Sequence, residues 1–187
     1  MGISRQQALD CFQSEDLVGI GMEADAVRRK LHPEGVVSYA VECRLGCRRL
    51  AGEAAEAGFE PVYAAAGEAV DGGATGVRFA GGGDGWGMKA YEEMVGGLRQ
   101  RFAGVWLEGL TADDVLKLAE RAGLSVGETL ARLAGAGLDS IGGYAGYEGK
   151  GWLGVHRTAH GLGMRTVAAV VFGGRETAEQ RVELLER

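Results

Sequence analysis

The sequence has no excess of basic residues and no long apolar segment. Its 20 Lys and Arg residues are outnumbered by 26 Asp and Glu residues, which gives a net charge of −6. Non-specific nucleic-acid binding depends on clustered basic residues, so this balance argues against it. No apolar run approaches the roughly 20 residues that a membrane span requires, and the first residues lack the apolar core of a secretory signal. We therefore expect a cytoplasmic protein that binds neither nucleic acid nor membrane.

Proline is also scarce, with two residues, whereas glycine is in excess, with 34 in 187 residues. Several glycines, such as Gly96 and Gly97, fall within segments that otherwise have the pattern of a helix. Each glycine costs a helix about 1 kcal/mol relative to alanine. The apolar pattern survives these glycines, so the sequence predicts a folded protein of marginal stability.

The chain is predicted to open with two amphipathic helices, the second beginning after Ser14 and ending before His32 and Pro33, because the residue before a proline disfavours helical geometry. Strands and helices then alternate. The predicted strands are 36–42, 61–66, 76–80, 104–110, 138–141 and 165–172, and the predicted helices are 47–57, 88–102, 112–122, 126–136, 152–162 and 176–187.

This alternation is typical of parallel βαβ units and predicts an α/β fold. A closed eightfold barrel needs about 250 residues, and the chain has 187. The pattern therefore favours an open or partial barrel, with a doubly wound sheet as the competing geometry. No repeat or linker is apparent, so we expect a single domain over residues 1–187, with leading helices in 1–34 and the alternating part in 35–187.

Three cysteines are too few for a disulfide framework. Cys43 and Cys47 follow the first predicted strand, and functional residues of parallel α/β folds gather after the carboxyl ends of strands. They are candidate cluster or metal ligands, and two unrelated core cysteines are the alternative. An iron–sulfur cluster with one open iron needs three thiolates, but Leu50 stands where a third cysteine would complete CxxxCxxC.

Two kinds of candidate follow other predicted strands. Gly81 and Gly82 come after residues 76–80, where glycine lets backbone N–H groups approach an anion. Asp139 and Glu176 are carboxylates expected at the carboxyl edge of the sheet, where each is a candidate for acid–base chemistry or substrate anchoring. A helix cap is the alternative role for both carboxylates.

His156 and His160 have the spacing of a metal-binding pair on one helix face. No third ligand lies nearby in the sequence. This pair therefore predicts a solvated helix face.

Four stretches resemble the dehypoxanthine futalosine cyclases, a branch of the radical S-adenosylmethionine family. They are ADAVRRKLHPEGVVSYAVE, GATGVRFAGGG, LEGLTADDVLKLAERAGLSVGETLARLAGAGLDSIGG and WLGVHRTAHGLGMRTVAAVVFGGRET, and they span nearly the whole chain in the family's order. The resemblance implies a partial (βα)6 TIM-like barrel with leading helices. It also implies a [4Fe-4S] cluster that cleaves S-adenosylmethionine to a radical, which acts on a futalosine-type nucleoside in menaquinone biosynthesis.

The resemblance also assigns residues to cofactor binding. These residues are Cys43 and Cys47 for the cluster, Gly81 and Gly82 for the methionine end of the cosubstrate, and Asp139, Gly142 and Gly143 for the strand end that lines the same pocket.

The sequence departs from the family at several positions. Leu50 replaces the third cysteine, Glu108 and Gly174 stand where the family usually has histidines, and the chain ends at Arg187 where relatives continue. These departures predict a truncated, degenerate cyclase without its activity.

Two alternatives stay open. One is an active enzyme whose third cluster ligand is His32, Glu53 or Cys11. The other is a non-catalytic protein that keeps the pocket to bind a nucleoside or a partner. Either protein could form a homo-oligomer.

Overall fold

The structure, a computed structural model, describes residues 2–52, 58–80, 85–142, 151–169 and 171–186. The chain divides into two compact units. Residues 40–169 form one, which we call the sheet unit. Residues 1–39 and 170–187 form the other, which we call the terminal unit.

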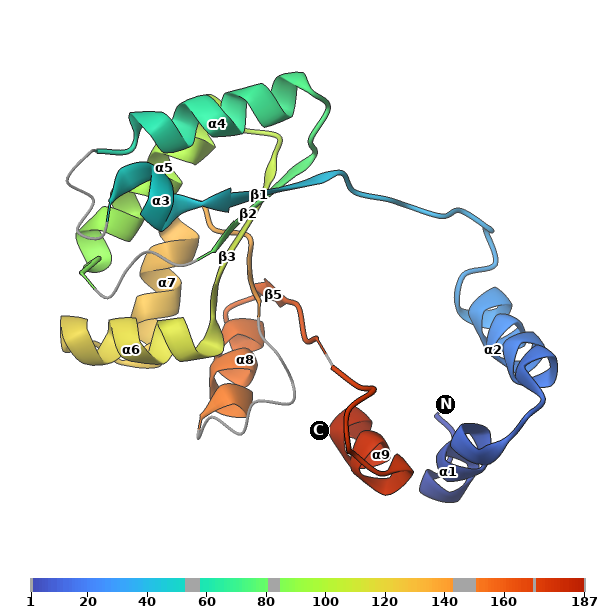
Figure 1. Cartoon of the computed structure of the whole chain (residues 1–187). Coiled ribbons are helices and arrows are strands. Elements are labelled where there is room, and N and C mark those ends of the chain that lie inside the picture. The colour runs from blue at the N-terminus through green and yellow to red at the C-terminus, as the bar shows by residue number, and fades with distance from the viewer. Residues whose placement is uncertain (1, 53–57, 81–84, 143–150, 170, 187) are drawn as a thin grey trace. The chain divides into compact units, whose positions relative to one another are not determined.

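Five parallel strands form the centre of the sheet unit (Figure 1). They lie side by side in the order of the chain, and each neighbouring pair is parallel. They are β1 (Glu42–Gly46), β2 (Gly76–Ala80), β3 (Trp106–Thr111), β4 (Ser140–Gly142) and β5 (Arg165–Thr166). The predicted α/β class with sequential parallel strands is confirmed, as right-handed βαβ crossovers lead one to expect.

Helices fill the connections between these strands (Figure 1). They are α3 (Cys47–Ala51), α4 (Glu60–Asp71), α5 (Met88–Arg101), α6 (Ala112–Ala122), α7 (Val126–Ala136) and α8 (Trp152–Gly161). The helices α6 and α7 begin at capping boxes, in which Thr111 pairs with Asp114 and Ser125 with Glu128. Each box satisfies N–H groups that the first turn would leave unpaired, and the predicted starts of both helices are confirmed.

The sheet has one apolar and one polar face. Leu45, Val77 and Leu107 are buried in the same core as the helices, on what we call the helix face. Because side chains alternate along a strand, their neighbours point to the opposite side, which we call the polar face. Arg44, Arg78 and Glu108 lie there.

Two predicted strands have different bounds in the structure. The first is displaced, because β1 runs from Glu42 to Gly46 and not over 36–42, and of the described residues in 165–172 only Arg165 and Thr166 form β5. A strand extends only as far as its neighbour can pair with it. The β1 ladder starts where Glu42 pairs with Gly76, the first residue of β2, and β5 pairs with a β4 of three residues.

Residues 61–66 form part of α4 and not the predicted strand. Pro61 lies in the first turn of the helix, where a missing N–H costs no hydrogen bond. Val62 and Ala66 are four residues apart and both buried, which is the spacing of one helix face. A short apolar segment does not separate a strand from a helix.

The terminal unit contains α1 (Arg5–Gln13), α2 (Leu17–Leu31) and α9 (Ala178–Glu186). An ion pair between Arg5 and Glu186 joins α1 to α9. The cap of α2 is Asp16, whose carboxylate accepts the Gly19 N–H at 2.8 Å, so the helix begins two residues later than predicted. Ser14 instead accepts the Asp16 N–H.

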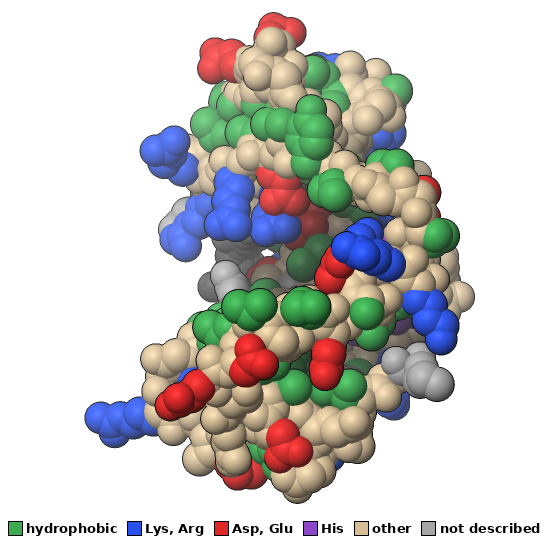
Figure 2. Space-filling view, turned by 90° about the vertical axis from the view of Figure 1, so that its right-hand side faces the viewer, with side chains coloured by type: hydrophobic (Ala, Val, Ile, Leu, Met, Phe, Trp, Pro, Cys, Tyr) green, Lys and Arg blue, Asp and Glu red, His purple; other side chains and the backbone are tan. Residues whose placement is uncertain are grey.

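The leading helices do not have the buried faces that their apolar patterns predict. Neither α1 nor α2 has a buried residue, and Cys11 is only partly buried. Apolar side chains of α2, such as Leu17 and Met22, are exposed. Apolar side chains also reach the surface on the face that Figure 2 presents. No helix in the described part of the chain has the length and apolar character needed to cross a membrane.

Candidate functional site

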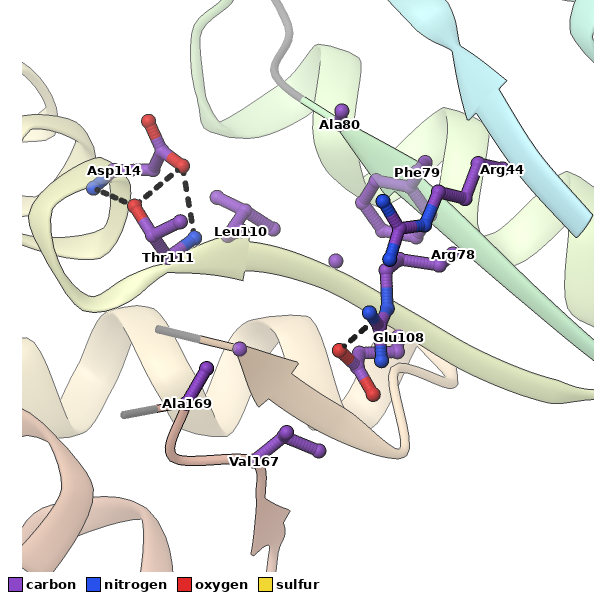
Figure 3. A pocket seen from close by; sticks show the side chains of 12 residues that line it. Arg44, Arg78, Phe79, Ala80, Glu108, Leu110, Thr111, Asp114, Val167 and Ala169 are labelled. Atoms are coloured by element: carbon purple, nitrogen blue, oxygen red, sulfur yellow. Dashed lines mark hydrogen bonds and ion pairs between the residues drawn. The ribbon is translucent and has the colours of Figure 1, made fainter. Parts of the chain in front are cut away.

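A cavity of about 390 Å³ opens on the polar face of the sheet unit (Figure 3). Its volume is in the range of small-molecule sites, roughly 300–1,000 Å³. The last residues of β2, β3 and β4, which are Ala80, Thr111 and Gly142, line it. The cavity therefore lies at the carboxyl ends of the strands, where parallel α/β folds bind ligands.

A chain of polar contacts crosses four strands on the polar face. Arg78 Nε lies 2.8 Å from Glu108 Oε1, and Arg78 Nη2 lies 3.3 Å from Glu42. Glu108 is buried and accepts a hydrogen bond from Ser140 Oγ, which in turn accepts one from the Trp106 indole. The Arg78 Nε–H has no aligned acceptor in the described structure, so its contact with Glu108 is an ion pair and not a hydrogen bond.

The backbone of β3 is irregular beside this network. Glu108 pairs with Ser140, and Thr111 pairs with Gly142. Between these pairs β3 has one residue more than β4, and this extra residue forms a β-bulge. Within it, Leu110 has a φ of 57° and a buried side chain. A non-glycine residue in this left-handed region costs about 1–3 kcal/mol, and such strain clusters at functional sites. The bulge turns the end of β3 where it lines the cavity.

The predicted cluster ligands lie in the apolar core. Cys43 is within β1, opposite Val77, and packs against the core on the helix face. The next residue, Arg44, lines the cavity on the other face. Cys47 is fully buried as the first residue of α3, and this burial raises the pKa of its thiol to about 12. Leu50 packs against the same core.

These residues do not fit a [4Fe-4S] cluster. The Cys47 side chain is fully buried in the apolar core and, like that of Cys43, does not line the cavity. Across the described residues, no three His, Cys, Asp or Glu side chains form a group that could hold a metal ion. Of the alternative third ligands, Cys11 and His32 belong to the terminal unit and Glu53 lies outside the described residues.

Asp139 lies at the amino edge of the sheet, so its predicted place at the carboxyl edge is wrong. The strand β4 begins at Ser140, two residues later than expected. The Asp139 carboxylate accepts the Leu107 N–H at 2.7 Å and pairs with Arg99 at 2.5 Å. Leu107 is the second residue of β3, and Arg99 is in the last turn of α5. The observed role of Asp139 is therefore to join these elements.

The other predicted binding residues have different outcomes. Gly142 lines the cavity, and a side chain there would begin 3.1 Å from Glu108 Oε1. Gly81, Gly82 and Gly143 lie outside the described residues.

Glu176 belongs to the terminal unit. Its carboxylate accepts the N–H groups of Gly173 and Gly174 and pairs with Arg181. The hydrogen bond from Gly173 is the main reason that the pKa of Glu176 is below its usual value. The acid–base role of Glu176 stays a prediction.

The prediction for the histidine pair of α8 is confirmed for one histidine and wrong for the other. His160 is exposed and shares a hydrogen bond with Thr166. His156 is buried, with its ring centre 4.3 Å from that of Trp152. Burial, with the charge of His160 as a smaller cause, lowers the pKa of His156. The prediction of a solvated face was wrong for His156, whose side chain is buried beside Trp152, one turn earlier on the same helix.

The arginines of the cavity were missed at the level of sequence. Arg44 and Arg78 each stand between apolar residues, in CRL and VRF. A single charge at the alternate position of an apolar strand indicates a second, polar face. That signal was available, and it would have placed Arg44 and Cys43 on opposite sides.

The chain is similar to curated proteins over nearly its whole length, although no family model matches it. It is 29% identical to the cyclic dehypoxanthine futalosine synthase of Streptomyces coelicolor over 98% of this chain and 54% of that protein. It is 33% identical to the aminodeoxyfutalosine synthase of Thermus thermophilus over 52% of this chain and 30% of that protein.

A third relative is the 5-amino-6-(D-ribitylamino)uracil–L-tyrosine 4-hydroxyphenyl transferase of Microcystis aeruginosa, 30% identical over 68% of this chain and 39% of that protein. The chain spans about half the length of the synthases that it matches along 98–99% of its own residues. The chain is thus similar to synthases of the futalosine pathway along nearly its whole length.

Proposed function

We propose that the chain is a degenerate member of the dehypoxanthine futalosine cyclase branch that binds a nucleoside-type small molecule and performs no cluster chemistry. The similarity to synthases of the futalosine pathway supports the branch and connects the chain to menaquinone biosynthesis. The five-stranded parallel sheet is then part of a TIM-like barrel, with the cavity at its carboxyl mouth.

One observation carries the loss of cluster chemistry. Cys43 packs on the helix face of β1, whereas the cavity lies on the polar face beside Arg44. A cluster acts on a ligand only when it contacts that ligand directly, and neither Cys43 nor Cys47 is among the described residues that line the cavity. The leucine at position 50 removes a third thiolate as well.

The cavity supports retained binding of a small molecule. It combines apolar walls, such as Phe79 and Leu110, with a small number of polar groups, such as Arg78 and Glu108, as ligand sites usually do. Gly142 is proposed to leave room for the cosubstrate or the nucleoside, because a side chain at this position would meet Glu108.

Anaerobic reconstitution with iron and sulfide tests whether the chain performs no cluster chemistry. We expect the natural chain to retain no stoichiometric iron and to cleave no S-adenosylmethionine. A Leu50→Cys variant supplies the third thiol as a comparison. About four irons per natural chain, with cleavage of S-adenosylmethionine, would overturn the proposal in favour of an active enzyme.

Calorimetry tests whether the cavity still binds a small molecule. We expect S-adenosylmethionine or dehypoxanthine futalosine to bind the natural chain and a Gly142→Val variant to lose this binding. A Gly154→Val variant is the matched control, because Gly154 lies on α8 with no atom near the position of a side chain. If neither compound binds the folded natural chain, the retained pocket is rejected.

A further inference from the structure

The helix α2 has a regular row of apolar side chains that no described part of the terminal unit buries. Within this unit α1 packs against α9, whereas α2 has no buried residue. Leu17 and Leu31, at the two ends of α2, are 77% and 65% exposed. The apolar positions alternate in steps of three and four residues, which is the a/d repeat of a coiled coil. We call this row the α2 seam, and it consists of Leu17, Ile20, Ala24, Val27 and Leu31.

The length of the α2 seam indicates what kind of surface covers it. With 15 residues, α2 is about 22 Å long, and the seam runs from its first residue to its last. An isolated helix of this length is only marginally stable in water, so α2 gains most from a second helix with a seam of the same length. A second copy of α2 has this property by symmetry, since a two-fold axis places the same surface on both partners.

The charges along α2 are divided between its two ends. The acidic residues come first and the basic residues last, and they are Glu15, Asp16, Glu23 and Asp25, followed by Arg28, Arg29 and Lys30. Asp25 forms ion pairs with Arg28 and Arg29 of the same helix. Beyond the helix, Glu34 lies 3.5 Å from His32 and pairs with it when the imidazole is protonated. The helix therefore has an acidic first half and a basic last turn.

This division favours an antiparallel pair of helices over a parallel one. In a parallel pair the basic last turns of both helices would meet, and so would the acidic first halves. In an antiparallel pair each basic last turn lies beside the acidic first half of the other helix, and the two helix dipoles are opposed. Ala24 is the central residue of α2, so its small side chain lies near the two-fold axis and lets the two helices approach closely.

We propose that two copies of the chain associate through the α2 seam as an antiparallel pair of helices. The apolar side chains of the two seams are buried against each other, and Lys30 of each copy faces the acidic first half of the other α2. One pair of helices of this length is too short to bury the roughly 1,200 Å² of a standard interface. The dimer is therefore weak, and it dissociates on dilution.

Sedimentation of the full chain at increasing concentration tests this association. We expect the natural chain to pass from monomer to dimer between micromolar and millimolar concentration. A Val27→Glu variant should raise the dissociation constant by about tenfold or more, because it buries an unpaired carboxylate in the seam. The matched control is Met22→Glu, which adds the same charge to the opposite side of α2, where Met22 is 70% exposed. This control should dimerise like the natural chain.

A Lys30→Glu variant tests the antiparallel direction. It places a negative charge beside the acidic half of the other helix, and we expect the dimer to weaken by about threefold or more. In a parallel pair the new carboxylate would instead meet basic residues and strengthen the dimer.

Circular dichroism shows whether each variant is folded. A natural chain that stays monomeric at millimolar concentration would overturn the proposal. A Val27→Glu variant that dimerises as well as Met22→Glu, or a Lys30→Glu variant that dimerises as well as the natural chain or better, would also overturn it. Unfolding of Val27→Glu alone would have the same consequence, because it would show that the α2 seam is covered within one chain.

Discussion

The two faces of one strand, β1, differ in every property that matters for function. On the helix face Cys43 and Leu45 pack into an apolar core, and on the polar face Arg44 points into a cavity. A one-residue slip of a strand would exchange the two sets of side chains. The register of β1 therefore decides whether thiols or guanidinium groups face the cavity.

The largest effect that we expect is a low reactivity of the Cys47 thiol, which is buried in the core just after β1. Burial raises the pKa of its thiol from an ordinary 9.0 to about 12, so at pH 8 its thiolate is about a thousandfold scarcer than that of a free cysteine. Alkylation by iodoacetamide, mapped by mass spectrometry, should leave Cys47 almost unmodified in the folded chain. Unfolding in urea should restore the reaction.

The raised pKa of Cys47 also makes the free energy of unfolding decrease at high pH. The folded state holds the Cys47 proton more tightly than the unfolded state, so this stabilisation is complete below pH 9 and is lost as the pH rises from about 9 to 12. Alkylation of Cys47 in the folded chain at the rate of a free thiol would contradict this prediction, because it would show that the side chain is accessible and not buried in the core.

A second prediction compares the stability contributed by the two faces. Leu107 is fully buried on the helix face, and a Leu107→Ala variant should lower the free energy of unfolding by about 2–5 kcal/mol, because it leaves a cavity. An Arg44→Ala variant on the polar face should change it by less than about 0.5 kcal/mol. Urea denaturation measures both. Equal losses would mean that the polar face is also part of the folding core.

Local sequence signals predicted the parts of this fold that depend on few residues. The capping boxes at Thr111 and Ser125 need only a hydroxyl and a carboxylate three residues apart, and both are present. The order of the strands followed from the alternation of strands and helices, since short right-handed connections leave few other topologies.

The candidate site was harder to predict because it depends on register and on strand ends. A start of β4 two residues later than expected moves Asp139 from one edge of the sheet to the other. The face of Cys43 is fixed by the pairing of β1 with β2, which the composition of the strand does not reveal. An error of one or two residues in the predicted bounds of a strand leaves the predicted fold unchanged. The same error moves a predicted site residue to another edge or face of the sheet.

A third prediction concerns the buried charge of the polar face. A Glu108→Gln variant removes the main counter-charge of Arg78, and we expect a loss of about 1–3 kcal/mol in the free energy of unfolding. This is below the usual cost of breaking a buried ion pair, because Arg78 keeps Glu42 and its side chain is 29% exposed. The exposed pair of Glu60 with Arg101 is the control, and Glu60→Gln should cost less than about 1 kcal/mol. Equal costs would show that burial adds nothing to the pair on the polar face.

A last prediction concerns two adjacent glycines of α5, a helix that packs into the core on the helix face. A side chain at Gly97 would begin 2.1 Å from the Tyr63 hydroxyl and 2.4 Å from its ring. The Tyr63 ring is held, because its hydroxyl donates to the Glu93 carbonyl and Arg101 stacks over it. We therefore expect Gly97→Ala to lower the free energy of unfolding by about 1–3 kcal/mol through overpacking.

Gly96, one residue earlier, has no such neighbour, since the nearest atom to an added side chain is 3.9 Å away. Alanine there should restore the helix propensity that glycine lacks and raise the free energy of unfolding by about 0.5–1 kcal/mol. Thermal and urea unfolding of the two single variants measure the difference in sign. If Gly96→Ala also destabilises the protein, α5 packs against its neighbours more closely than described, and the helix face has no spare volume at this position.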